Sequence, residues 1–122
     1  MNVYVYGKCS TCKSALLFLK KQRVIFVEKE ITKTPPSVEE LQKMLQYKKG
    51  HLKALFNTSG QLYRDLKLNE KLDAMPLEEA LNLLSQNGML VKRPFLIGDD
   101  FGFTGFNEAE WGKCFANCPD RN

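Results

Sequence analysis

The sequence is poor in several features that would place it in a specialised protein class. Its 122 residues include one histidine, one tryptophan, five prolines and eight glycines. This ordinary glycine and proline usage excludes collagen-like and low-complexity chains. No apolar run approaches the roughly 18 to 20 residues that span a bilayer, and the start, Met1 to Lys8, is too short and too polar for a signal peptide. We therefore expect a soluble, cytoplasmic protein with no membrane contact.

Acidic residues are absent from the first 27 positions, and the formal net charge of the whole chain is +4. No block of lysine and arginine alternates with aromatic residues as a single-strand binding surface requires, so direct nucleic-acid binding is not expected. The pattern indicates a solvated surface that is positive over the first third of the chain. The length fits a single domain, residues 1–122, with room for one core.

The cysteines form two tight pairs, Cys9 with Cys12 and Cys114 with Cys118. A small secreted scaffold would spread its cysteines along the chain, so a structural disulfide framework is not expected. A redox or nucleophilic motif and a four-cysteine zinc site both fit the count. The zinc site would need the two ends of the chain to be adjacent and would consume a reactive thiol, so we expect no metal.

The hydrophobic pattern predicts a βαβ unit at the start: a strand at 2–6, a helix at about 11–22 and a buried central strand at 24–27. Two strands joined in this way are expected to be parallel. In the strand at 2–6, Val3 and Val5 face one way and Tyr4 and Tyr6 the other.

The next part of the chain is predicted to be helical. Ser37 and Glu40 form a capping box that begins a helix ending at Gly50, and short helices follow at 52–56, 61–66, 69–72 and 77–86. A hairpin of strands at 95–97 and 101–104 and a helix at about 107–115 complete the chain. The predicted fold is α/β: a thioredoxin/glutaredoxin-like, four-stranded mixed sheet from about 1–32 and 91–118, with an all-helical insertion at about 33–90.

Cys9 and Cys12 form a CxxC motif that follows a strand and begins a helix. A thiolate at a helix N-terminus faces unpaired backbone N–H groups and the positive end of the helix dipole, so its pKa falls. This context predicts Cys9 as a nucleophile and Cys12, about one turn further, as the thiol that resolves a mixed disulfide. Lys8 adds positive potential. Two inert buried thiols are the alternative.

Arg93 and Pro94 open the first strand of the predicted hairpin. A cis-proline at this point of a thioredoxin-type fold lies opposite the cysteine turn, and cis peptide bonds are found almost only before proline. Arg93 could then stabilise the Cys9 thiolate or hold an oxyanion. A trans proline with a solvent-facing arginine is an equal alternative.

Several motifs strongly resemble those of one family, and they occur in the same order: 4–12, 56–66, 88–94 and 105–108. The chain resembles the ArsC/Spx family, which groups glutaredoxin-coupled arsenate reductases with Spx transcription regulators and a branch of small relatives. The segment at 57–60 is most similar to that branch. The resemblance implies a thioredoxin-like fold with Cys9 and Arg93 as catalytic residues. We expect a substrate site at Lys8, Ser10, Thr11, Asn57 and Pro94.

Arsenate reductases of this family use two further arginines, whose places fall at Asn57 and Phe106, and they carry no cysteine where this chain has Cys12. A dianion site that lacks buried donors binds poorly, so arsenate reduction is disfavoured. The Spx regulators keep a CxxC switch that matches Cys9 and Cys12. They bind the C-terminal domain of the RNA polymerase α subunit through a glycine expected near Gly50, although a lone glycine at a helix end is more often a cap.

The resulting interpretation is thiol–disulfide exchange by Cys9, Cys12 and Arg93, acting on a thiol or disulfide substrate or a redox protein. Catalysis and redox sensing both remain open, because both need an exposed cysteine of low pKa with a resolving neighbour. We expect a monomer without bound cofactor, with glutathione and glutaredoxin or thioredoxin as electron donor. His51, the one histidine, has no evident triad partner and is expected on the surface.

Overall fold

The computed structural model describes residues 1–116 and contains one four-stranded mixed sheet. Its strands are β1 (Asn2–Val5), β2 (Val27–Glu30), β3 (Phe95–Ile97) and β4 (Gly102–Thr104), in the spatial order β2-β1-β3-β4. β1 is parallel to β2, and β3 is antiparallel to both β1 and β4. The predicted α/β class and the parallel βαβ unit are therefore confirmed.

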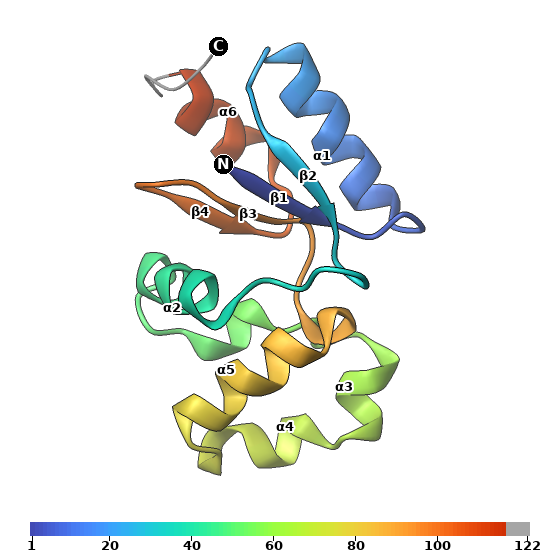
Figure 1. Ribbon diagram of the computed structural model, residues 1–122, viewed down its shortest axis with the longest axis vertical. Helices are drawn as coiled ribbons and strands as arrows, with labels where there is room; N and C mark the ends of the chain where they lie inside the picture. Colours follow the sequence, from blue (N-terminus) through green and yellow to red (C-terminus); the bar gives the residue numbers. More distant parts are fainter. Residues whose placement is uncertain (117–122) are drawn as a thin grey trace.

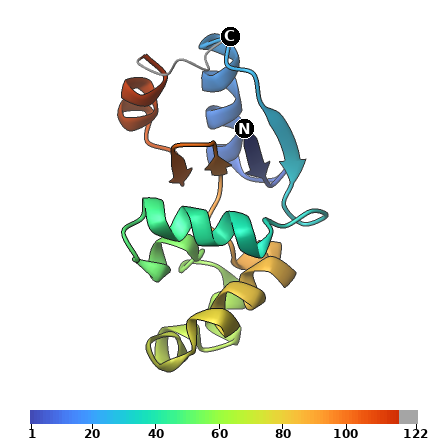
Figure 2. The ribbon, with the colours of Figure 1, turned by 60° about the vertical axis from the view of Figure 1, so that its left-hand side comes forward.

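The helices lie on both faces of the sheet (Figures 1 and 2). α1 (Ser10–Lys21) and α6 (Glu108–Ala116) cover one face, and every other helix of residues 1–116 lies between β2 and β3 in the sequence. These others are α2 (Val38–Tyr47), α3 (Gln61–Asp65), α4 (Leu68–Lys71) and α5 (Leu77–Gln86), together with the 3-10 turns η1 (Leu52–Leu55), η2 (Leu72–Ala74) and η3 (Gly88–Leu90). Within residues 1–116, no helix has the length and apolar character needed to cross a membrane.

The two sides of β1 belong to two different hydrophobic clusters, as the alternation of its residues predicts. Val3 and Val5 pack with α1 and with Trp111 of α6. Tyr4 faces the helices of the middle segment and contacts the ring of Phe95 edge to face, with 5.8 Å between the centroids. The sheet is thus a layer between two cores, and it fixes the start of α1 relative to β3.

The prediction of a buried central strand at 24–27 was wrong. The strand starts at Val27, whose N–H donates to the carbonyl oxygen of Met1 at 2.9 Å, and β2 lies at the edge of the sheet. Arg23, at a φ of 58°, turns the chain after α1; Val24 is buried and Phe26 packs half-buried on the same cluster, whereas Ile25 and Val27 are 70% and 55% exposed. The apolar run is therefore a connection that packs on the core through Val24 and Phe26 and forms no strand of its own.

Gly88 is required for close packing of the backbone. A Cβ atom at this position would lie 2.0 Å from the carbonyl oxygen of Ile31, which no side-chain movement relieves. The sequence suggested that Asn87 and Gly88 end a helix, and α5 does end at Gln86. Any larger residue at Gly88 would push η3 away from the segment that follows β2.

Glu40 connects the sheet to the helical segment. Its side chain completes the predicted capping box of α2 with Ser37 and also accepts hydrogen bonds from the Tyr4 hydroxyl at 2.6 Å and the Asn2 amide at 3.0 Å. Burial raises the pKa of Glu40, but the bonds from Tyr4, Asn2 and Ser37, with the nearby Lys29 charge, outweigh it and hold the pKa below its usual range. One carboxylate therefore caps α2 and fixes it to β1.

We expect Glu40→Ala to lower the free energy of unfolding by about 1–3 kcal/mol, because the buried hydroxyl of Tyr4 loses its acceptor. The pKa of Glu40 is lower in the folded than in the unfolded protein, so its contribution is present at neutral pH. That contribution disappears as the pH falls through the lowered pKa. Urea denaturation at pH 7 and pH 3 tests this, with exposed Glu39→Ala as the control; equal effects of the two substitutions would contradict it.

Candidate functional site

Cys9 lies at the carboxyl end of β1, where the chain turns into α1. Its backbone N–H donates to the carbonyl oxygen of Tyr6 at 3.0 Å, and Cys9 is the N-cap residue of α1. The N–H of Cys12 points back and donates to the Sγ of Cys9 at 3.3 Å. A half-buried sulfur thus occupies the position where a helix N-terminus stabilises negative charge.

The two thiols of the pair differ in acidity. Partial burial works against ionisation of Cys9, but hydrogen bonds from the thiol and N–H of Cys12, the Arg93 charge and the N–H of Thr11 together hold its pKa below the ordinary value. Burial, reinforced by the neighbouring Cys9, raises the pKa of Cys12 to about 12. At neutral pH the ionised form of the pair therefore carries its charge on Cys9.

Arg93 approaches the cysteine turn from the segment that enters β3. The Arg93-Pro94 peptide bond is cis, the first of the two alternatives left open by the sequence. The guanidinium lies over the ring of Tyr6, 5.1 Å from its centroid, and its Nη1 donates to the carbonyl oxygen of Met89 at 3.3 Å. The Nε–H of Arg93 is buried and has no acceptor within residues 1–116. Arg93 therefore acts on Cys9 through its charge, and its Nε–H is a buried donor without a partner in the described residues.

The other five predicted site residues differ in exposure and in how their backbone is held. Lys8, Ser10 and Thr11 are exposed around the start of α1, and the Pro94 carbonyl oxygen accepts from the N–H of Gly105 at 2.8 Å. Asn57 is half-buried, and its N–H donates to the carbonyl oxygen of Leu90 at 2.7 Å, so its backbone is fixed to the segment that leads to Arg93. Substrate binding by these five residues stays a prediction.

Two residues near the site were not predicted from the sequence. Tyr6 supplies the ring beneath Arg93, and Glu30 at the end of β2 accepts a hydrogen bond from the N–H of Gly7 at 3.0 Å. Residues at the carboxyl ends of two adjacent parallel strands meet at one edge of the sheet, and Val5 is paired with Glu30. With the second strand assigned to 27–30, this rule would have placed Glu30 beside the cysteine turn.

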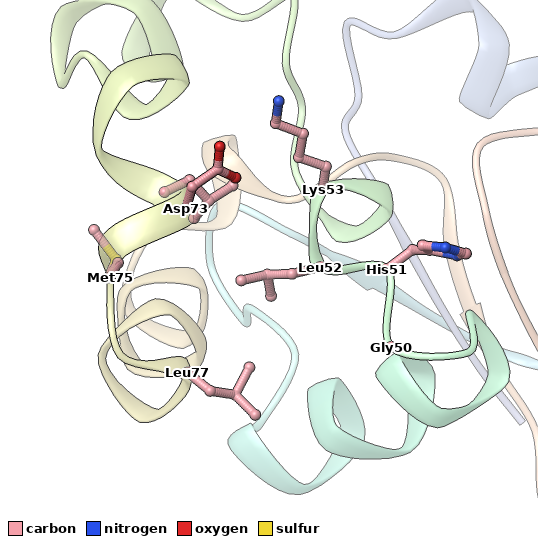
Figure 3. A pocket seen from close by; sticks show the side chains of 8 residues that line it. Gly50, His51, Leu52, Lys53, Asp73, Met75 and Leu77 are labelled. Carbon is pink, nitrogen blue, oxygen red and sulfur yellow. The ribbon is translucent and has the colours of Figure 1, made fainter.

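Gly50 and His51 line a pocket that contains none of the residues of the cysteine turn. It has a volume of about 390 Å³ and lies between η1 and the segment from η2 to the start of α5. Figure 3 shows Leu52 and Leu77 pointing toward the space between these elements and His51 pointing away from it. α2 ends at Tyr47, and Gly50 closes the turn after it with a φ of 82° and an N–H that donates to the carbonyl oxygen of Leu45, which is a capping arrangement.

The second cysteine pair is only partly within the described residues. Cys114 is half-buried in α6, and Cys118 lies outside residues 1–116. Among the described residues, no group of three or more histidine, cysteine, aspartate or glutamate side chains could hold a metal ion.

The mixed sheet, the cysteine at the start of α1 and the cis-proline before β3 define a thioredoxin-like α/β protein with a thiol site. The chain belongs to the ArsC family, whose sequence model matches residues 4–114. It is 39% identical over 116 residues to YusI of Bacillus subtilis (strain 168), covering 95% of this chain and 98% of YusI.

Two further similarities concern different branches. The Enterococcus faecalis global transcriptional regulator Spx is 30% identical over 110 residues, covering 90% of this chain and 82% of Spx. The crystal structure of a possible arsenate reductase from Streptococcus mutans UA159 superposes with a TM-score of 0.82 at 37% identity, covering 91% of this chain and 96% of that one. The resemblance to the ArsC/Spx family and the thioredoxin-like fold are confirmed.

The charge of Arg93 leads to a measurable expectation for Cys9. The rate of alkylation by iodoacetamide follows the thiolate fraction, so it rises with pH up to the pKa of Cys9 and then levels off. We expect Arg93→Gln to move this midpoint to higher pH and to slow alkylation at pH 7 roughly three- to tenfold, because an opposite charge is lost. The control is Lys13→Gln, which removes an exposed charge on α1; a midpoint unchanged in Arg93→Gln would contradict the expectation.

Proposed function

We propose that the protein is a thiol–disulfide oxidoreductase in which Cys9 is the nucleophile and Cys12 the resolving thiol. The observation that carries the proposal is the difference between the two thiols: Cys9 is half-buried, accepts the N–H of Cys12 and has a lowered pKa, while Cys12 is buried and has a raised one. An exchange reaction of this kind needs an ionised attacking sulfur and a second thiol that enters later.

The reaction would proceed in two balanced steps. The Cys9 thiolate attacks one sulfur of a substrate disulfide, a new S–S bond forms, the substrate S–S bond breaks, and the first thiolate leaves. Cys12 then loses its proton and attacks the Sγ of Cys9, which releases the second substrate thiolate and leaves a Cys9–Cys12 disulfide. The substrate gains two electrons, and a thiol reductant such as glutathione with glutaredoxin, or thioredoxin, restores both cysteines.

The second candidate is a redox-sensing regulator that binds the C-terminal domain of the RNA polymerase α subunit. It is supported by the similarity to Spx over most of the chain, and Cys9 and Cys12 match the CxxC switch that the family resemblance implies. In this case oxidation of Cys9 and Cys12 changes binding, and turnover is absent. Pull-down of the purified α subunit by the oxidised and the reduced protein tests it, and equal, background-level recovery in both states would exclude it.

Arsenate reduction with glutathione and glutaredoxin is the third and weakest candidate. It is supported by the likeness to the possible arsenate reductase of Streptococcus mutans. The places expected for two further arginines are held by Asn57 and Phe106, so a bound dianion would have Arg93 as its remaining guanidinium partner there. We expect arsenate turnover to be weak or absent in an assay with both thiol donors.

The experiment for the main proposal uses the order of the two steps. Cys12→Ser should stop the reaction at the mixed disulfide, because the resolving thiol is missing. With an excess of glutathione disulfide at pH 7, mass spectrometry should show one glutathione on Cys9 in Cys12→Ser and a Cys9–Cys12 disulfide in the wild type. Cys114→Ser should behave as the wild type. Absence of any Cys9 adduct in Cys12→Ser would refute Cys9 as the nucleophile.

A further inference from the structure

A pocket of about 370 Å³ lies next to the cysteine turn, and it connects three elements: the start of α1, the cis-proline segment and the β4–α6 connection. Two of its lining residues, Thr11 and Arg93, are also the ones whose N–H and charge lower the pKa of Cys9. Cys9 itself does not line the pocket, but a ligand there would contact two residues that interact with the Cys9 thiolate. Its volume is near the lower end of the range for small-ligand sites, about 300 to 1,000 Å³.

The pocket combines an apolar wall with few charges of mixed sign. Phe103 and Phe106 line it, and both rings rest on fully buried Trp111, at 5.5 Å in a stacked and 4.8 Å in an edge-to-face arrangement. Because Trp111 is held in the core, the two half-buried phenylalanine rings form a fixed apolar wall. Such a wall suits an apolar side chain better than a hydrated ion.

The polar groups of the pocket point to a neutral peptide as the ligand. Lys92 and Arg93 contribute positive charge, but Glu110 also lines the pocket, so a compact dianion would meet a carboxylate as well as the cations. A neutral peptide brings no charge to the pocket, so neither the cations nor the carboxylate disfavours it.

Resting on the thiol–disulfide exchange proposed above, we propose that this pocket binds polypeptide disulfides in which an apolar side chain adjoins the reacting cysteine. Phe106 is the specificity-determining residue, because its ring forms the wall on which that side chain packs. The Cys9 thiolate bonds to the sulfur of the peptide, the peptide disulfide breaks, and the former partner of the peptide leaves as a thiolate. Binding of the neighbouring side chain raises the rate of this step without taking part in it.

The test compares two blocked pentapeptides, each joined through its cysteine to 2-mercaptoethanol, with phenylalanine or serine next to the cysteine. Since one methylene group in an apolar pocket discriminates by about 10-fold or more, we expect the wild type to consume the phenylalanine peptide at least about tenfold faster at equal low concentration. Phe106→Ala should reduce this preference to about twofold or less. Phe106→Gln, which keeps most of the volume, gives the same readout if the alanine variant fails to fold.

The control variant is Phe101→Ala. Phe101 packs in the same aromatic cluster, against Phe103 and Phe115, but it does not line this pocket, so the preference should remain. Equal rates for the two peptides in the wild type, or an unchanged preference in folded Phe106→Gln, would overturn the inference. The small disulfide bis(2-hydroxyethyl) disulfide separates this from the proposed function: if the wild type fails to react with it at all, the exchange chemistry itself is refuted.

Discussion

Replacing Cys9 by serine is expected to abolish disulfide exchange, with a loss of at least about a thousandfold in the rate constant. A serine hydroxyl at the same N-cap accepts the same N–H of the helix, so the start of α1 is retained. The hydroxyl is not ionised at neutral pH, however, and the surrounding donors cannot make it so. The measurement is the rate of reduction of bis(2-hydroxyethyl) disulfide, with the substitution Cys114→Ser as the matched control.

Because the N-cap is preserved, a loss of exchange in Cys9→Ser reports the loss of the nucleophile and not unfolding of the protein. Circular dichroism and the midpoint of urea denaturation should be close to those of the wild type, because serine is among the preferred N-cap residues. Exchange that continued in Cys9→Ser at more than about a thousandth of the wild-type rate would show that another thiol carries the reaction. Cys12 would then be the next cysteine to replace.

Trp111→Ala is expected to have the largest effect on stability, a loss of about 3–5 kcal/mol in the free energy of unfolding. Trp111 is fully buried, and its ring contacts four phenylalanines from three different parts of the chain: Phe18, Phe103, Phe106 and Phe115. Its removal leaves a cavity between α1, β4 and α6 that these rings cannot fill while the sheet holds its register.

Urea denaturation followed by circular dichroism measures this loss, since Trp111 is the single tryptophan and the variant has no tryptophan fluorescence. Trp111→Phe should lose less, because it retains much of the buried ring. Leu17→Ala, at a position 59% exposed on α1, is the control and should change the free energy by about 0.5 kcal/mol or less. A loss in Trp111→Ala no larger than that of the control would show that the aromatic cluster packs differently.

The fold could be predicted where the periodicity of the sequence is strong. Alternation placed Val3 and Tyr4 on opposite faces, the capping box predicted Ser37 as the N-cap of α2, and the hairpin predicted at 95–97 and 101–104 is the pair β3 and β4. The second strand could not be placed in this way. Its residues, 27–30, are a valine and three charged residues on an exposed edge, so they resemble a solvated loop, whereas the apolar run before it resembles a strand.

The site was predictable to the extent that its chemistry is local. The cysteine turn is a short stretch whose N-cap geometry follows from the strand and helix beside it. The contacts of Tyr6 with Arg93 and of Glu30 with Gly7 join residues 87 and 23 positions apart in the numbering, and only the register of the sheet brings them together. One of the two roles of Glu40 could be predicted from the sequence. The capping box is a local pattern, whereas the hydrogen bond with Tyr4 joins residues 36 positions apart.

In the proposed exchange reaction, the raised pKa of Cys12 would also set the lifetime of the mixed disulfide at Cys9. A thiol whose pKa lies so far above neutral pH is almost entirely protonated at pH 7, so resolution is slow as long as this pKa persists. Bond formation at Cys9 removes its negative charge, one of the causes that keep the Cys12 proton in place. Burial remains and continues to delay the second step, so a partner joined to Cys9 stays bonded to the protein until Cys12 ionises and releases it.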